Sequence, residues 1–112
     1  MAFEEDSGRI VVVAAGFALW KGGKCIAAAR WADIRSLTAH RSSSGESVRL
    51  VVELMDGARL EFLEAAPGFD AFLDRASATL SGLLPFAGWH PKLMLAEPGG
   101  EGAAIFQRTS RY

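Results

Sequence analysis

Cysteine is almost absent from this chain, and the sequence contains no spaced cluster of metal-binding side chains. The single cysteine, Cys25, cannot form an internal disulfide and cannot join other thiolates around a zinc ion. The two histidines, His40 and His90, do not stand at metal-ligand spacing from a second ligand, so we interpret them as loop or surface residues. We therefore predict no metal and no cofactor, a Cys25 buried in a strand, and a reducing cytoplasm as the compartment.

A large excess of charge of one sign is also missing. The 12 Lys and Arg residues against 13 Asp and Glu residues give a net charge of -1, which argues against nucleic-acid binding and against binding to a membrane surface. No uninterrupted apolar run reaches the roughly 20 residues of a transmembrane helix. The apolar run from Ile10 to Trp20 follows Glu4, Glu5 and Asp6, where a signal peptide carries positive charge, so we interpret this run as a strand.

What the chain does contain is enough apolar sequence for one globular domain. Half of its 112 residues are hydrophobic and 22% are charged, and no linker or internal repeat divides residues 1–112. The polar ends, residues 1–8 and 109–112, are expected to be frayed. Arginine outnumbers lysine and alanine is abundant, which gives the compositional impression of a GC-rich bacterial genome.

The first part of the chain predicts two strands around a tight turn. The β-branched run Ile10 to Val13 indicates a strand covered on both faces, with Gly16 as a bend or bulge within it. Gly22-Gly23 is typical of a hairpin turn, after which Cys25 to Trp31 is expected to return as a strand. A helix beginning at Ala27 and running to Leu37 is the alternative, because that segment holds good helix formers.

The clearest local pattern is a second hairpin between Ser47 and Glu64, where apolar and other residues alternate with period two. A three-residue loop, Met55 to Gly57, with Gly57 in the left-handed conformation, matches the two strands best. This register pairs Val52 with Leu60, Leu50 with Phe62, and Glu53 with Arg59.

Three apolar residues of this hairpin, Val51, Met55 and Leu63, fall on its outer face among charged side chains. Such a position indicates that the face is partly covered. Two-fold packing of a second copy is an economical way to cover it, so we predict these three residues as an interaction surface in a homodimer.

Pro67 to Ser81 predicts the main α-helix, with Pro67 in its first turn and Gly82 as a left-handed cap. One stripe of this helix is apolar: Phe69, Phe72, Leu73, Ala76 and Leu80. Beyond it, Phe86 to Pro91 is expected to be irregular, Lys92 to Glu97 a short turn or strand, and Ala103 to Arg108 a final strand.

No segment carries a recognisable catalytic motif. Ser42-Ser43-Ser44-Gly45 lacks the glycine spacing of a nucleophile elbow, and Gly99-Gly100-Glu101-Gly102 precedes no helix on which a phosphate could sit. Asp70 and Asp74 are expected on the solvent face of the main helix, where they solvate it. The sequence therefore predicts that the protein is not an enzyme.

Four pieces of the chain together resemble small bacterial proteins that look like pleckstrin-homology-type domains. They are Trp31 to Ser36, Asp56-Gly57, Glu64 to Asp70 and Trp89, and the resemblance covers roughly residues 9 to 108. It implies a binding or scaffolding module without catalytic residues. Phosphoinositide binding, known for relatives of that fold, would map onto Lys21 and Lys24, although two lysines on a solvated turn are a weak anion site.

We therefore expect an α+β domain in which a curved antiparallel sheet or partly open barrel of five to seven strands packs on the helix at about residues 67–81. Its expected core contains Trp31, Phe62, Phe69, Phe72 and Leu80. The expected function is non-catalytic recognition of a protein partner, or self-association. The alternatives are a small cytoplasmic inhibitor of a toxin and an enzyme without a recognisable motif.

Overall fold

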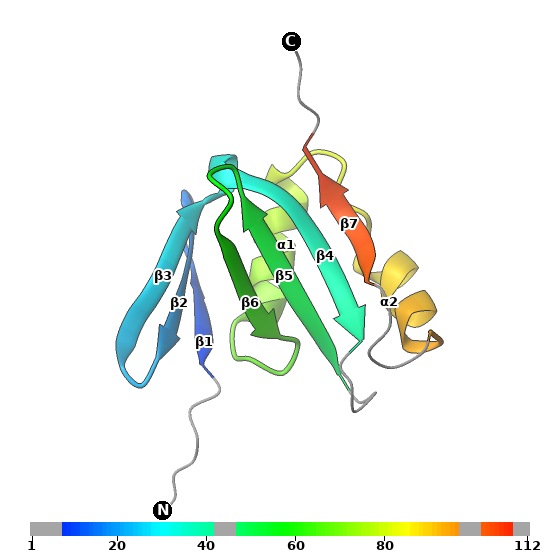
Figure 1. Cartoon of the computed structure of the whole chain (residues 1–112), viewed down its shortest axis with the longest axis horizontal. Helices are drawn as coiled ribbons and strands as arrows, with labels where there is room; N and C mark the ends of the chain where they lie inside the picture. The colour runs from blue at the N-terminus through cyan, green and yellow to red at the C-terminus, as the bar shows by residue number, and fades with distance from the viewer. Residues whose placement is uncertain (1–7, 42–46, 97–101, 109–112) are drawn as a thin grey trace, which may run out of the picture.

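Two antiparallel sheets and two helices form the α+β fold of the computed structural model, which describes residues 8–41, 47–96 and 102–108 (Figure 1). The frayed ends expected at residues 1–8 and 109–112, and the loops expected at residues 42–45 and 99–102, lie wholly or almost wholly outside the described residues. The predicted α+β class is confirmed. Instead of one main helix, however, the described residues form two α-helices.

The N-terminal sheet has three strands in the order β1-β2-β3, and the central sheet has four in the order β6-β5-β4-β7. Within the described residues no strand pairs with both sheets, so the sheets are not closed into a barrel. The strands are β1 Arg9–Val12, β2 Gly16–Lys21, β3 Lys24–Arg30, β4 Ile34–Arg41, β5 Val48–Leu54, β6 Arg59–Leu63 and β7 Ala103–Gln107.

The apolar run from Ile10 to Trp20 is a hairpin, so the prediction of one strand there was wrong. Val13 and Gly16 exchange backbone hydrogen bonds of 2.9 and 3.3 Å, which turns the chain back on itself. Gly16 does not bend a strand: it lies against the carbonyl of Ala29, which leaves no room for a Cβ. Val13 is 55% exposed, so the run is not covered on both faces either.

The Gly22-Gly23 turn is confirmed, with φ angles of 59° and 78°. The returning segment is a strand, β3, which rules out the helix alternative. The prediction of a buried Cys25 was wrong: Cys25 is exposed, because β3 is an edge strand and none of its residues is buried.

The register of the second hairpin is confirmed at every predicted pair, including Val52 with Leu60 and Leu50 with Phe62. Gly57 has a φ of 92°, and Leu54 N–H donates to the carbonyl of Ala58 at 2.8 Å, which closes the three-residue loop.

Helix α1 runs from Phe69 to Thr79 and therefore begins two residues after the predicted Pro67. Its start is set by β1: Ile10 N–H donates to the carbonyl of Pro67 at 2.8 Å, and Gly68 passes against the carbonyl of Ile10 with a φ of 94°. The prediction of Gly82 as the helix cap was wrong: Gly82 has a φ of 93° but lies in the turn beyond the helix, whose C-cap is Leu80 in an extended conformation.

A second helix, α2, runs from Phe86 to Met94, where the sequence predicted irregular chain and then a short turn or strand. That prediction was wrong, because Pro91 removes a single helical hydrogen bond whereas Trp89 and Leu93 both gain burial on the inner face. The final strand is confirmed as β7, which pairs with β4.

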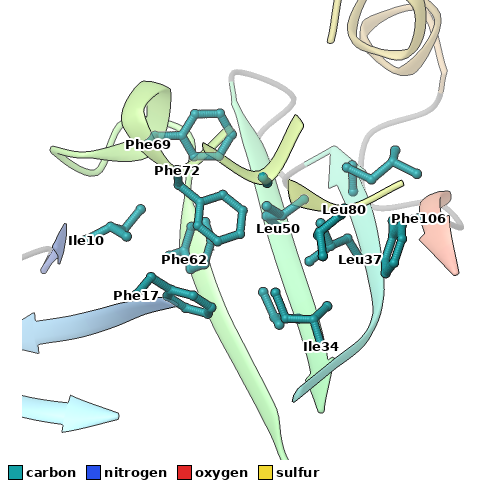
Figure 2. Close-up of a cluster of buried hydrophobic side chains, with 14 of the residues drawn as sticks. Ile10, Phe17, Ile34, Leu37, Leu50, Phe62, Phe69, Phe72, Leu80 and Phe106 are labelled. Carbon is teal, nitrogen blue, oxygen red and sulfur yellow. The ribbon is translucent and has the colours of Figure 1, made fainter. Parts of the chain in front are cut away.

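The core is an aromatic cluster between the two sheets and α1 (Figure 2). Phe72, which is 0% exposed, has ring centroids of Phe17, Phe62 and Trp31 within 4.9, 5.0 and 5.4 Å of its own. The five predicted core residues, Trp31, Phe62, Phe69, Phe72 and Leu80, are all buried.

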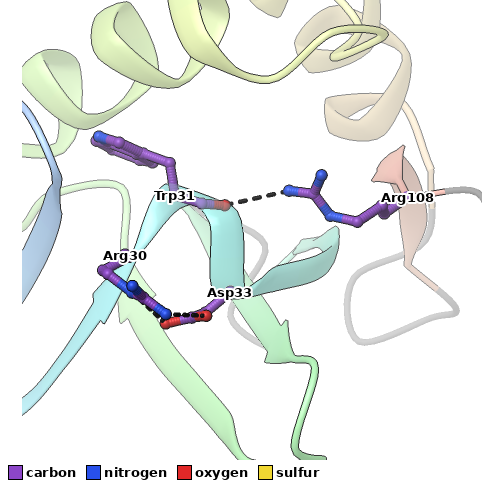
Figure 3. Close-up of polar contacts among 4 residues, drawn as sticks. All are labelled: Arg30, Trp31, Asp33 and Arg108. Atoms are coloured by element: carbon purple, nitrogen blue, oxygen red, sulfur yellow. Dashed lines mark hydrogen bonds and ion pairs between the residues drawn. The ribbon is translucent and has the colours of Figure 1, made fainter.

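The sheets are connected at the 3-10 turn Trp31–Asp33, which several polar contacts hold in place (Figure 3). Arg30 donates from Nε and Nη2 to the Asp33 carboxylate at 3.1 and 3.2 Å. Arg108 donates to the carbonyls of Ile34 and Trp31 at 2.9 and 3.2 Å. This end of the molecule is therefore closed by hydrogen bonds.

Candidate functional site: the inter-sheet groove

A groove of about 330 Å³ lies at the end of the molecule away from the Trp31–Asp33 turn. It is formed where β1 begins, β2 ends and β6 ends, so both sheets contribute to it. We call it the inter-sheet groove. Its floor continues the hydrophobic core and consists of Ile10, Leu19, Phe62 and Ala66.

The walls of the groove are larger apolar side chains that remain accessible to solvent. Ile26 from β3 is 55% exposed and Leu63 from β6 is 40% exposed, and both line the groove together with Trp20. Large apolar side chains gathered on a concave surface are a common feature of binding sites, whereas single exposed ones are ordinary. The groove can therefore cover an apolar group of a ligand.

Among the described residues, the rim of the groove carries three cations and one carboxylate. The guanidinium of Arg9 lies 5.8 Å from the ring centroid of Trp20, which orients it by a cation–π contact. Arg49 Nε lies 3.8 Å from Glu61 Oε1, and both side chains are about half exposed, so this ion pair is weak. Lys21 and Arg9 have no ion-pair partner among the described residues. The rim is therefore suited to an anionic group.

The structure divides the predicted site residues between the groove and other surfaces. Lys21, predicted as an anion-binding candidate, and Leu63, predicted as part of an interaction surface, both line the groove. Lys24 is exposed on the far side of the Gly22-Gly23 turn and does not line it. Val51 and Met55 also lie outside the groove, and Met55 is 52% exposed in the turn after β5.

The groove residues that sequence reasoning missed include Arg9, Trp20 and Ile26. Arg9 and Trp20 are opposite each other in the β1–β2 ladder, a pairing that was hidden when the two strands were interpreted as one. Ile26 is the extra residue of a bulge, where Leu19 pairs with Ala27 but Trp20 pairs with Cys25. No residue type in β3 signals this bulge.

The two histidines lie apart from the groove and from each other. His40 is half-buried in β4, and His90 lies on α2 with its Nε2 3.1 Å from Glu64 Oε2. The ring of Phe86, also on α2, stacks on that of His90 with centroids 4.4 Å apart. In the described parts of the chain, no group of three His, Cys, Asp or Glu side chains is placed to hold a metal ion.

Two of the other concave surfaces, one between α2 and β7 and one on the outer face of the central sheet, are less developed as sites. A groove of about 410 Å³ between α2 and β7 is apolar except for Lys92. The outer face of the central sheet alternates arginine and glutamate around Val51, with Ser36 Oγ 3.3 Å from Glu53 Oε1. On this face the arginine and glutamate side chains balance each other in charge.

As predicted, Asp70 and Asp74 are exposed on α1. None of the helices described in residues 8–41, 47–96 and 102–108 is long and apolar enough to cross a membrane. No protein-family model, curated protein or solved structure matches this chain.

Proposed function

We propose that this chain is a non-catalytic module that binds a protein partner through the inter-sheet groove. The observation that carries the proposal is an apolar floor together with a rim of Arg9, Lys21 and Arg49, against which the described lining sets one carboxylate, that of Glu61. Charges on a rim steer and orient a partner, and apolar contacts in the centre supply most of the affinity. Both features occur together in this groove.

The chemistry of the groove supports binding over catalysis. Its charged groups are guanidinium, ammonium and one solvent-exposed carboxylate, and the described residues that line it include neither histidine nor cysteine nor a serine beside a base. An enzyme without a recognisable motif remains the competing proposal. A small molecule that stays bound to the purified protein would favour it. An inhibitor of a toxin would be one form of the protein-binding proposal, with the toxin as partner.

The resemblance to pleckstrin-homology-type domains is part of the same proposal. Two facing antiparallel sheets with a helix against their shared core support it. The departure is the C-terminal part, because α1 is followed by α2 and by β7, which joins the central sheet beside β4. In such a module the two sheets serve as a frame, and binding takes place at their open end.

Self-association is a second form of the proposal, supported by Val51 and Leu63, which are diagonal neighbours on the β5–β6 ladder. In this case Val51→Glu with Leu63→Lys should convert a dimer into a folded monomer, since both side chains are directed away from the core. Sedimentation of the unmodified chain as a monomer at high micromolar concentration would rule out the homodimer.

The proposal is tested by purifying the tagged chain from its native host and identifying what accompanies it. The groove variant combines Lys21→Glu with Leu63→Asp. The control variant combines Lys24→Glu with Met55→Asp. It likewise replaces one lysine and one apolar residue, but at exposed positions outside the groove. We expect the groove variant to lose the partner and the control to retain it. Both variants should show the melting temperature of the unmodified chain to within a few degrees.

The opposite pattern, with the partner retained by the groove variant and lost by the control, would contradict the proposal. The proposal would also fail if a bound metal or small molecule, rather than a protein, accompanied the chain in stoichiometric amount.

A further inference from the structure

We infer that the groove receives an extended segment of the partner, which adds as a strand to the free edge of β6 and carries an apolar side chain flanked by carboxylates. The inference rests on the proposed function and specifies what the groove binds. It follows from the backbone of β6 and from the charges of the rim.

The backbone of β6 offers hydrogen bonds toward the groove. Glu64 N–H donates to the carbonyl of Val48, and Leu54 N–H donates to that of Ala58. Because hydrogen-bonded positions alternate along an antiparallel pair, Leu60 and Phe62 direct their N–H and C=O groups to β5. Arg59, Glu61 and Leu63 therefore direct theirs to the other side, which is the edge of the sheet.

That edge is open at Glu61. The carbonyl of Leu63 accepts the N–H of Ala66 at 2.9 Å, but within the described residues the N–H and C=O of Glu61 have no partner. At two of the other three sheet edges, backbone groups do have partners: Ile10 of β1 donates to Pro67, and Ile105 of β7 accepts from Leu84 at 2.9 Å. An edge strand with unpaired groups beside an apolar groove is the arrangement used in strand addition.

The side chains around this edge define the chemistry of the added segment. Ile26 and Leu63 form apolar walls and would contact an apolar side chain of the segment. Arg9 on β1 and Lys21 on β2 line the groove from the other sheet and would pair with carboxylates next to that side chain. A basic segment would instead bring like charges together on the rim, which costs affinity.

A second copy of this chain fits the edge less well than an acidic segment. Antiparallel pairing of β6 with its own copy over its full length would set Glu61 opposite Glu61, with like charges in direct contact. We therefore assign the site to an acidic, extended segment of a different protein.

The test uses a fluorescein-labelled peptide of sequence Thr-Glu-Val-Glu-Leu-Glu-Thr and measures fluorescence anisotropy with the full chain. Three further peptides are compared with it: one with lysine in place of glutamate, and two with N-methyl groups on alternate amides, in either phase. N-methylation removes backbone donors on one edge of the peptide and leaves its side chains in place. We expect saturable binding of the acidic peptide, weakening of about tenfold or more with the lysine peptide, and loss of binding for one N-methylated phase only.

The variant Arg9→Glu with Lys21→Glu should weaken the acidic peptide about tenfold or more, whereas Lys24→Glu should not change its affinity. If both N-methylated peptides bind as well as the parent, strand addition is wrong although the groove still binds. If no peptide binds while a natural partner still requires Lys21 and Leu63, the acidic extended ligand is wrong and the proposed function stands. Binding that Arg9→Glu with Lys21→Glu leaves unchanged would place the peptide elsewhere and overturn the inference.

Discussion

Strand β5, an inner strand of the central sheet, and strand β3, the outer strand of the N-terminal sheet, differ in how far their side chains are buried. In β5, Val48, Leu50 and Val52 are 0% exposed, so this strand is covered on its inner face by α1 and the aromatic cluster. In β3 no residue is buried, and its middle consists of small uncharged side chains with the exposed Ile26. Both strands belong to antiparallel sheets, but only the first is part of the core.

This difference separates stability from binding. The central sheet and α1 bury most of the apolar surface, so they determine the free energy of unfolding. The N-terminal sheet is attached through the Trp31–Asp33 turn and the Ile10–Pro67 hydrogen bond, and its outer strands form one wall of the groove. Substitutions in that wall should change binding with little change in stability.

The largest difference in the free energy of unfolding is expected between the variants Phe72→Ala and Ile26→Ala. Phe72 is fully buried against three aromatic rings, so its truncation should lower the free energy of unfolding by about 3–5 kcal/mol. Ile26 is 55% exposed, and its truncation should cost less than about 1 kcal/mol. Urea denaturation measures both values. Equal losses for the two variants would show that the N-terminal sheet carries as much of the core as the central one.

A second contrast compares two glycines with nearly equal backbone angles. Gly57 and Gly68 have φ angles of 92° and 94°, but a Cβ on Gly57 would enter open space whereas one on Gly68 would collide with the carbonyl of Ile10. Gly57→Ala should therefore cost about 1 kcal/mol, from the backbone conformation alone. Gly68→Ala should cost about 3 kcal/mol, since overpacking is added. Similar losses in urea denaturation would mean that β1 moves away from the start of α1 without penalty.

These contrasts also show what the sequence could predict. The β5–β6 register and the buried stripe of α1 follow from local periodicity, and a slip of one residue in either would expose apolar side chains, so both were predictable. The β1–β2 hairpin was not, because Val13 to Gly16 lacks a typical turn sequence and the β-branched residues around it form one continuous run. In α2, Pro85, Gly88 and Pro91 conceal the spacing of Trp89 and Leu93.

The groove could be predicted only in part from the sequence, because local patterns do not show which distant segments lie side by side. Its two halves lie far apart in the sequence, with Arg9, Lys21 and Ile26 on one sheet and Glu61 and Leu63 on the other. Lys21 and Leu63 were recognised singly, from a turn and from an alternating pattern. Their proximity depends on how the two sheets approach each other, which no local pattern encodes.

The smallest effect on the free energy of unfolding is expected from the exposed ion pair of Arg30 and Asp33, at the Trp31–Asp33 turn. Hydrogen bonds from Arg30 hold the pKa of Asp33 below its ordinary value of about 3.9. A lowered pKa in the folded state means that the stabilisation is present above the unfolded-state pKa and is lost as pH falls through the folded-state pKa. The free energy of unfolding should thus fall slightly more steeply below about pH 5 in the unmodified chain than in Asp33→Asn. If urea denaturation gave the same pH dependence of the free energy of unfolding for the unmodified chain and for Asp33→Asn, this prediction would be contradicted.

The central claim, that the open end of the two sheets is the binding site, is tested most directly by mapping amide chemical shifts while the co-purified partner is added to the isotope-labelled chain. The account predicts that the largest changes occur at Arg9, Lys21, Ile26, Glu61 and Leu63, with little change in the buried part of β5. Changes centred on α2 and β7, or on Val51 and Met55 with none at Arg9 and Lys21, would contradict it.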